Sequence, residues 1–262
     1  MSFFKVDMER RSGISPFVIV LIASFLLGIF SVFLRRAARQ DEMDNAAPTP
    51  VAVNLLNTEA TTPEPSRHTS VALLLGVDTL STTSPTLRSL WIIEFHPSGR
   101  DIRFLGVPVD LQLAGPSTPS LQDVFTFSRG TGVGEAFIST ANYLSPYPAD
   151  FYIVLDEIAL ETGLDFLGGV NLEGDNFTGS QLVRVLRLLA DDPSADLKMQ
   201  AEILSKLVND AVDLSSNLDI TPLVALIPEH AYTSVDPLAL SSMAASMLPV
   251  RPEDIVIDLF LP

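Results

Sequence analysis

The chain of 262 residues contains no cysteine. This absence excludes a disulfide framework, a thiolate nucleophile and a thiolate metal site. Histidine is also scarce, and His68, His96 and His230 lie far apart along the sequence. Histidine ligands of a metal usually come in closely spaced sets, so we do not expect a histidine-based metal site.

Two motifs of nucleophilic and nucleotide chemistry are also missing. The sequence has neither a G-x-S-x-G elbow nor a G-x-x-x-x-G-K-[ST] phosphate loop. The stretch "GTGVG" at 130–134 has alternating glycines, but no strand pattern leads directly into it. We interpret it as a flexible turn before a helix and not as a nucleotide cradle.

Positive charge is scarce and unevenly placed. The chain has 16 Lys and Arg against 32 Asp and Glu, a net charge of −16. Residues 1–40 hold six basic and two acidic residues, a net of +4, which leaves ten basic and thirty acidic residues in 41–262, a net of −20. So acidic a body repels nucleic acid, and any anionic ligand would need a local cation or a metal.

One long apolar run stands near the N-terminus, "FVIVLIASFLLGIFSVFL" at 17–34. As a helix it would span about 27 Å, close to the thickness of the hydrocarbon core of a bilayer. The run is long for a cleaved signal peptide, and no A-x-A-like cleavage site follows it. We predict a single transmembrane helix, although three basic residues on each side leave its orientation open.

The segment 35–69 has the composition of a linker. Its part from 40 to 68 contains "AAPTP" and "TTPEPS" and almost no aromatic residue. Such a stretch cannot bury enough apolar surface to offset its ordering entropy. It would hold the body, residues 70–262, at some distance from a membrane.

The body has the pattern of an α/β domain. Short runs rich in β-branched and aromatic residues predict strands at 71–78, 89–95, 101–108, 150–155 and 253–262. The Pro- and Gly-containing turn "HPSGR" predicts that the second and third strands form an antiparallel hairpin. Helical periodicity appears at 134–144, 156–164, 179–191, 194–212 and 236–248. We predict a central mixed sheet flanked by helices.

Charged residues stand at the ends of strands or inside apolar helices. Asp78 follows "LLLGV", Arg88 precedes "SLWII", Asp110 follows "LGVPV", and Arg187 lies within "LVRVLRLL". Each could be a strand-end cap, a turn charge or a surface ion pair, although an arginine among leucines must snorkel or find an anionic partner. The acidic pairs at 156–157 and 191–192 lie at helix ends, where we interpret them as caps or solvated faces.

The order of these segments resembles the LytR-CpsA-Psr family of bacterial cell-envelope phosphotransferases. Three short segments match family motifs: "LLLGVD" (73–78), "RSLWII" (88–93) for R-S-D-T and its strand, and "PVD" (108–110) for P-R-D. Two longer segments also match: "DFYIVLDEIALETGLDFLGGV" (150–170) for the strand, helix and LGGV unit, and "FTGSQLVRVLRLL" (177–189) for the helix that ends in R-F-R. The resemblance covers nearly the whole body. It implies an N-terminus (1–16) in the cytoplasm and an extracytoplasmic domain at 70–262.

The resemblance also implies a substrate and a site. The donor would be a polyprenyl-pyrophosphate-linked glycopolymer, whose lipid tail lies in an apolar tunnel between sheet and helices. Two carboxylates would hold Mg²⁺ and arginines would bind the pyrophosphate, because both neutralise charge on a transferring phosphoryl group. Asp78 matches the first metal carboxylate and Arg88 the arginine of R-S-D, both as catalytic residues. Asp110 matches the aspartate of P-R-D and could complete the metal site, while Arg187 and Gln200 match further phosphate ligands.

Three positions depart from the family pattern. Leu90 stands in place of the second metal carboxylate, Val109 in place of the P-R-D arginine, and Leu189 in place of the second arginine of R-F-R. One well-placed arginine can change the rate of phosphoryl transfer by about 10³–10⁵. We therefore expect phosphotransferase activity to be weakened or lost.

Three hypotheses follow for the function. The first is an active transferase in which Asp78 and Asp110 share Mg²⁺ and Arg88 and Arg187 bind phosphate. The second is a degenerate relative that binds a lipid tail or glycan without chemistry. The third is a tethered interaction module that uses the domain only as a scaffold. In each case the partners are the membrane and a lipid, glycan or protein, and no nucleic acid.

Overall fold

The computed structural model describes residues 69–96, 101–113, 118–210, 227–236 and 252–260. The expected transmembrane helix at 17–34 lies outside these residues, as do nearly all of the linker and the expected helix at 236–248. Of the helices that the structure does describe, none combines the length and apolarity that a membrane crossing requires.

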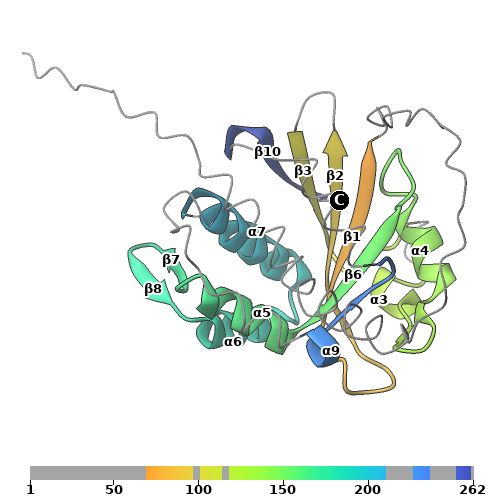
Figure 1. The fold of residues 1–262 in the computed structure, drawn as a ribbon, viewed down its shortest axis with the longest axis horizontal. Helices are drawn as coiled ribbons and strands as arrows, with labels where there is room; N and C mark the ends of the chain where they lie inside the picture. The colour runs from red at the N-terminus through yellow and green to blue at the C-terminus, as the bar shows by residue number, and fades with distance from the viewer. Residues whose placement is uncertain (1–68, 97–100, 114–117, 211–226, 237–251, 261–262) are drawn as a thin grey trace, which may run out of the picture.

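The body is built on one mixed sheet of six strands (Figure 1). Its spatial order is β10-β3-β2-β1-β6-β9. β1 runs antiparallel to β2 and parallel to β6, β2 runs antiparallel to β3, β3 runs parallel to β10, and β9 runs antiparallel to β6. The strands are β1 (Ser70–Val77), β2 (Leu87–His96), β3 (Asp101–Val107), β6 (Phe151–Asp156), β9 (Ala231–Thr233) and β10 (Ile255–Leu259).

Alternation along the central strands creates two apolar faces. Successive side chains of a strand point to opposite sides of the sheet. In β1, Leu73 and Leu75 enter one core cluster, while Ala72 and Leu74 belong to the cluster on the other side. Because both faces are covered, the central strands read as nearly continuous apolar runs.

Helices cover the two faces unequally (Figure 1). The short helices α3 (Leu121–Val124) and α4 (Glu135–Ala141) lie on one side, beside a two-stranded sheet formed by β4 (Phe127–Ser128) and β5 (Gly132–Val133). On the other side lie α5 (Glu157–Phe166), α6 (Gly179–Leu189) and α7 (Pro193–Asp210). The hairpin of β7 (Val170–Leu172) and β8 (Asp175–Phe177) joins α5 to α6, and α9 (Ile227–His230) leads into β9.

Side-chain caps define the starts of the helices around the site. Asp156 caps α5 by accepting hydrogen bonds from the backbone N–H groups of Ile158 and Ala159. Thr178 and Gln181 form a capping box at the start of α6. Asp192 accepts from the N–H of Ala195 at the start of α7. The interpretation of both acidic pairs as containing helix caps is thereby confirmed.

The sequence predicted the longer strands and helices with shifted ends, but it did not predict the short elements α3, α9, β4, β5, β7, β8 and β9. The antiparallel hairpin of β2 and β3 is confirmed. The expected helix at 134–144 ends at 141, and the expected strand at 253–262 begins with the 3₁₀ turn η2 (Pro252–Asp254) before β10. The stretch "GTGVG" does lead into a helix, α4, and begins with a turn at Gly130 and Thr131, but Gly132 and Val133 are buried and pair with β4 as the short strand β5.

Candidate functional site

The strand register brings the predicted site residues to one end of the sheet. Asp78 follows β1, and Val77 pairs with Asp156 at the end of the parallel strand β6. At this same end Gly76 pairs with Ser89, the neighbour of Arg88, in the antiparallel strand β2. Because Leu90 pairs with Val107, the turn that carries Asp110 also leaves the sheet here. The strand order therefore gathers segments that are distant in sequence.

A β-bulge sets the direction of the Arg88 side chain. The register between β1 and β2 shifts between Gly76, which pairs with Ser89, and Val77, which pairs with Leu87. Arg88 is the extra residue between them. Leu87 and Leu90 both enter the core on the α3–α4 side of the sheet, whereas Arg88 lines a cavity on the α5–α7 side. Bulges commonly re-aim one side chain beside a functional site, and this one does so for the arginine.

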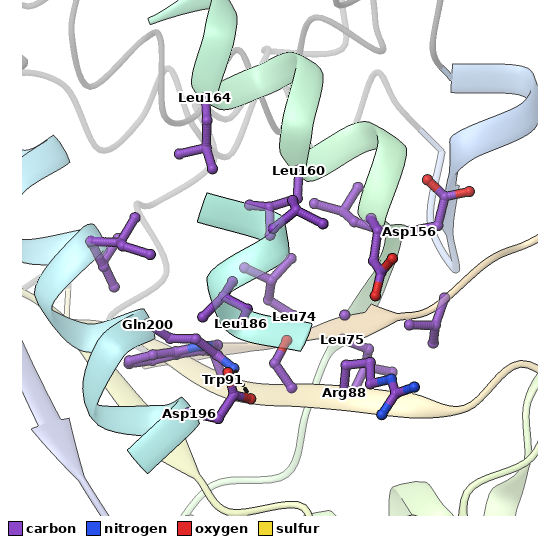
Figure 2. A pocket seen from close by; sticks show the side chains of 18 of the residues that line it. Leu74, Leu75, Arg88, Trp91, Asp156, Leu160, Leu164, Leu186, Asp196 and Gln200 are labelled. Carbon is purple, nitrogen blue, oxygen red and sulfur yellow. Dashed lines mark hydrogen bonds between the residues drawn. The ribbon is translucent and has the colours of Figure 1, made fainter. Parts of the chain in front are cut away.

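The cavity lies between the sheet and helices α5, α6 and α7 and has a volume of about 200 Å³ (Figure 2). Its floor comes from β1, β2 and β3, and its walls are mostly aliphatic. Figure 2 shows the leucines between two polar ends, with Trp91, Gln200 and Asp196 at one and Arg88 with Asp156 at the other. The apolar lining residues include Leu74, Trp91, Phe104, Leu160, Leu164, Val183, Leu186, Ile203, Leu204 and Leu207.

Arg88 supplies a cation whose hydrogen-bonding capacity is not fully used. Its Nε atom is buried and has no hydrogen-bond partner in the described part of the chain. A buried donor left without an acceptor costs free energy of about 1–3 kcal/mol.

Arg187 also lines the cavity, but a carboxylate already holds it. Its Nε donates to Glu157 Oε2 at 2.7 Å, and its Nη2 donates to the same oxygen. This hydrogen bond raises the pKa of Arg187. Glu157 lines the same cavity, so the pair adds little net charge for a bound anion. The apolar helix thus gives its arginine an anionic partner and a largely exposed position.

Gln200 belongs to a chain of hydrogen bonds at the other polar end. Trp91 Nε1 donates to Gln200 Oε1 at 3.0 Å, and Gln200 Nε2 donates to Asp196 Oδ2 at 2.8 Å. Both functional atoms of the Gln200 amide are therefore engaged by protein. Burial raises the pKa of Asp196 to about 6, while the bond from Gln200 and the charge of Arg88 oppose this rise.

The structure adds Asp156, Asp196 and His230 to the site, none of which we had predicted to be site residues. Asp156 is 2% exposed and lines the cavity, and its Oδ2 lies 2.8 Å from His230 Nδ1. The signal for Asp156 was present, since it follows a predicted strand, but we interpreted the pair at 156–157 only as a cap or a solvated face. His230 is 74 residues away, and no local pattern links the two.

Two predicted site residues do not line the cavity. Asp78 Oδ1 accepts from the N–H groups of Thr79 and Thr86 and closes the turn after β1. Asp110 is exposed. Within the described ranges, no group of three or more His, Asp or Glu residues could hold a metal ion. Because the Asp78 carboxylate accepts hydrogen bonds from the backbone and Asp110 is exposed, these side chains do not form a ready Mg²⁺ site.

The structure shows where the three residues that depart from the family motifs lie. Leu90 is fully buried in the core on the far side of the sheet from the cavity. Val109 is partly buried and packs against the same core. Leu189 is partly buried and does not line the cavity. At Leu90 and Val109 the apolar side chains therefore serve packing.

Taken together, the cavity can hold an apolar chain but offers little positive charge to its head. Five ionisable side chains line it, and three are carboxyl groups: Asp156, Glu157 and Asp196. Glu157 holds Arg187, which leaves Arg88 as the cation without a carboxylate bonded to it among the described lining residues. A pyrophosphate would meet one available arginine beside several carboxyl groups.

Comparison with known proteins adds information about the fold. No protein-family model and no curated protein sequence matches the chain. Among solved structures, B. subtilis TagV aligns with a TM-score of 0.55 and 15% identity over 74% of this chain and 85% of TagV. The protein gbs0355 from Streptococcus agalactiae aligns with a TM-score of 0.54 and 17% identity over 73% and 77%. A structure of TagT bound to LIIa-WTA aligns with a TM-score of 0.54 and 14% identity over 75% and 80%.

These likenesses define the class of fold. TagV and TagT are LytR-CpsA-Psr enzymes. The described part of this chain is therefore a LytR-CpsA-Psr-like domain by its fold, as the order of its motifs predicted. At 13–17% identity such a likeness carries the architecture and leaves activity to be argued from the site.

Proposed function

We propose that this chain is a membrane-anchored cell-envelope protein that handles a polyprenyl-linked glycopolymer lipid, and that its phosphotransferase activity is weakened or lost. The mostly aliphatic cavity between the sheet and α5–α7 carries this proposal, because it suits an isoprenoid chain. The fold shared with TagV and with TagT bound to LIIa-WTA supports an envelope glycopolymer as the ligand class.

Weakened catalysis follows from the polar groups around that cavity. Phosphoryl transfer depends on cations that neutralise charge on the transferring group. Arg88 is available, but Arg187 is bonded to Glu157, and Gln200 is bonded to Trp91 and Asp196. Losing one arginine from such a site lowers the rate by about 10³–10⁵. Mg²⁺ at Asp78 and Asp110 stays a prediction.

The second candidate is a scaffold that binds lipid, glycan or protein at the outer face of the cytoplasmic membrane without chemistry. The observation that favours it is the ion pair of Arg187 with Glu157, because this pair occupies an arginine that the sequence motif predicted to bind phosphate. In both candidates residues 17–34 anchor the chain, residues 1–16 are cytoplasmic and residues 70–262 are extracytoplasmic.

A turnover assay measures how much phosphotransfer activity remains, and residual Arg88-dependent turnover would favour the first candidate over the second. The full chain is incubated with a polyprenyl-pyrophosphate-linked glycan and Mg²⁺, and release of polyprenyl phosphate is measured for the natural chain, Arg88→Ala and Arg184→Ala. Arg184 lies on α6 like Arg187, but it is exposed and does not line the cavity. We expect turnover near background, with any residual activity lost in Arg88→Ala and retained in Arg184→Ala.

Rapid Mg²⁺-dependent turnover that needs Arg88 would contradict weakened catalysis. Lipid binding is tested separately by native mass spectrometry of the chain purified from bacterial membranes. We expect a bound polyprenyl species that is lost when Leu160→Glu places a charge in the cavity wall. Purified chain that carries no polyprenyl lipid would contradict the lipid-binding part of the proposal.

A further inference from the structure

The cavity extends along α5 from an open end to a buried end. Its lining includes Glu157 and Arg187, whose side chains are 17% and 63% exposed. It also includes Leu164 and Ile203, which are only 2% and 5% exposed. Glu157 begins α5 and Leu164 lies near the other end of that helix (Figure 2). The ion pair therefore stands at the entrance, and Leu164 stands at the inner end.

A separate core cluster closes the inner end. Its buried members are Leu164, Val170, Leu172, Leu182 and Ile203. Leu164 and Ile203 line the cavity, whereas the other three members do not line it and pack behind these two. A close-packed interior leaves few voids into which a bound chain could continue. Within the part of the chain that the structure describes, the cavity therefore ends at this cluster.

The volume of the cavity limits how many carbon atoms it can hold. A dry apolar cavity of about 150 Å³ binds one benzene molecule, which has six carbon atoms. By the same ratio, the cavity of about 200 Å³ here holds about eight carbon atoms. An isoprene unit has five carbon atoms, so this volume corresponds to between one and two units.

The depth of the cavity leads to the same limit. Between Glu157 and Leu164 the helix α5 makes two turns, which cover about 10 Å along its axis. An extended chain advances about 1.1 Å per bond, since the three backbone bonds of a strand residue cover about 3.3 Å. A chain of about nine bonds therefore fits this depth. Each isoprene unit adds four bonds to its chain, so the depth corresponds to two units.

We propose that this cavity accepts no more than about two isoprene units of a lipid, so that affinity stops rising once the chain exceeds ten carbon atoms. This inference rests on the proposed binding of an isoprenoid chain and adds a limit of length to it. The remaining units of a longer polyprenyl chain stay outside the cavity. Two apolar side chains next in sequence to the ion pair, Ile158 and Leu188, are 49% and 76% exposed and offer those units a contact surface.

A series of prenyl alcohols measures this limit. The full chain, kept in solution by an amphipathic polymer without tryptophan, is titrated with prenol, geraniol, farnesol and geranylgeraniol, which contain one to four isoprene units. Trp91 is the only tryptophan of the chain and lines the cavity, so its fluorescence reports binding. Equilibrium dialysis gives the concentration of free alcohol to which each Kd refers.

The Kd values should fall and then level off. We expect Kd to fall at least about thirtyfold from prenol to geraniol, because the second unit leaves water and enters the cavity. From geraniol to farnesol and from farnesol to geranylgeraniol, we expect Kd to change by less than about threefold, because the added carbon atoms stay outside the cavity.

A variant at the inner end tests where the limit is set. Leu164→Ala removes three carbon atoms there and makes room for the end of geraniol, so the ratio of the prenol Kd to the geraniol Kd should rise at least about threefold. Leu188→Ala is the same substitution at an exposed residue outside the cavity, and it should leave this ratio unchanged. Circular dichroism checks that both variants are folded.

The outcomes separate this inference from the proposed function. A Kd that falls more than about threefold with each unit beyond geraniol would overturn the limit of length and leave lipid binding standing. An unchanged ratio in folded Leu164→Ala would overturn the limit as well. If no alcohol changes Trp91 fluorescence and none displaces the copurified polyprenyl lipid, both proposals fail. The natural chain alone measures the limit, so the inference stays testable even if Leu164→Ala does not fold.

Discussion

Asp196 is a buried carboxyl group that the fold holds at a cost in stability. Burial raises its pKa from 3.8 to about 6. The folded protein therefore binds this proton more tightly than the unfolded chain does. The stability linked to this proton is fully present below the pKa of the unfolded chain and is lost as the pH rises through about 6. Two pKa units correspond to at most about 3 kcal/mol.

We therefore predict that Asp196→Asn stabilises the fold at neutral pH. The free energy of unfolding should rise by about 1–3 kcal/mol at pH 7.5, because a buried charge is removed while the acceptor oxygen remains. The difference should disappear near pH 4, where Asp196 is protonated. Denaturant unfolding followed by Trp91 fluorescence at both pH values measures this. A stabilisation that is equal at both pH values would contradict the electrostatic explanation.

At the scale of elements, the cavity depends on how closely α5 and α6 approach each other. Gly179 begins α6, and a Cβ atom there would lie 2.1 Å from the backbone carbonyl oxygen of Glu161 in α5. Backbone cannot move aside as a flexible side chain can. The N–H of Gly179 also donates to Asp165 Oδ1 at 2.6 Å, which ties the two helices together. The distance between the two helices that wall the cavity is therefore set by this close contact between their backbones.

We predict that Gly179→Ala destabilises the domain by about 1–3 kcal/mol, because it forces the two helices apart. Trp91 fluorescence should also shift in the folded state, since the cavity that it lines widens. Gly130→Ala is the matched control, because the new methyl group there would meet no atom within 4 Å. Urea unfolding of both variants gives the measurement. Equal stability of the two variants would show that the helices adjust without cost.

At the scale of the whole molecule, charge and hydropathy divide the chain into two parts. Residues 1–40 carry a net +4 and include the apolar run 17–34, whereas residues 41–262 carry −20. A body this acidic would be repelled from an anionic membrane surface. The linker would then keep the cavity accessible from the aqueous side.

We predict that the full chain sediments with membranes after a high-salt wash and that removal of residues 1–34 makes it soluble, because an apolar helix and not surface charge provides the attachment. In intact cells an added protease should cleave the linker and release the body. A body that stays uncut until the cells are permeabilised would instead place it in the cytoplasm.

Local sequence patterns were enough to predict much of the architecture. The apolar runs of β1, β2, β3 and β6 and the turn between β2 and β3 identified the strands, because strand propensity and hairpin turns act over a few residues. The order of strands and helices was enough to indicate the class of fold. Boundaries shifted by a few residues, and the strand β5 within "GTGVG" was missed because it exists only through its pairing with β4.

The site depended on contacts that no local pattern contains. A bulge between β1 and β2 turns Arg88 toward the cavity. Glu157, 30 residues away in the sequence, binds Arg187, and His230 in α9, 74 residues away in the sequence, contacts Asp156. Composition and periodicity reflect the secondary-structure preference and the charge of each segment by itself, so they were enough to predict the sheet and the acidic body. Which charges meet, and where the core leaves a cavity, follows from long-range packing, and these are the properties that select a ligand.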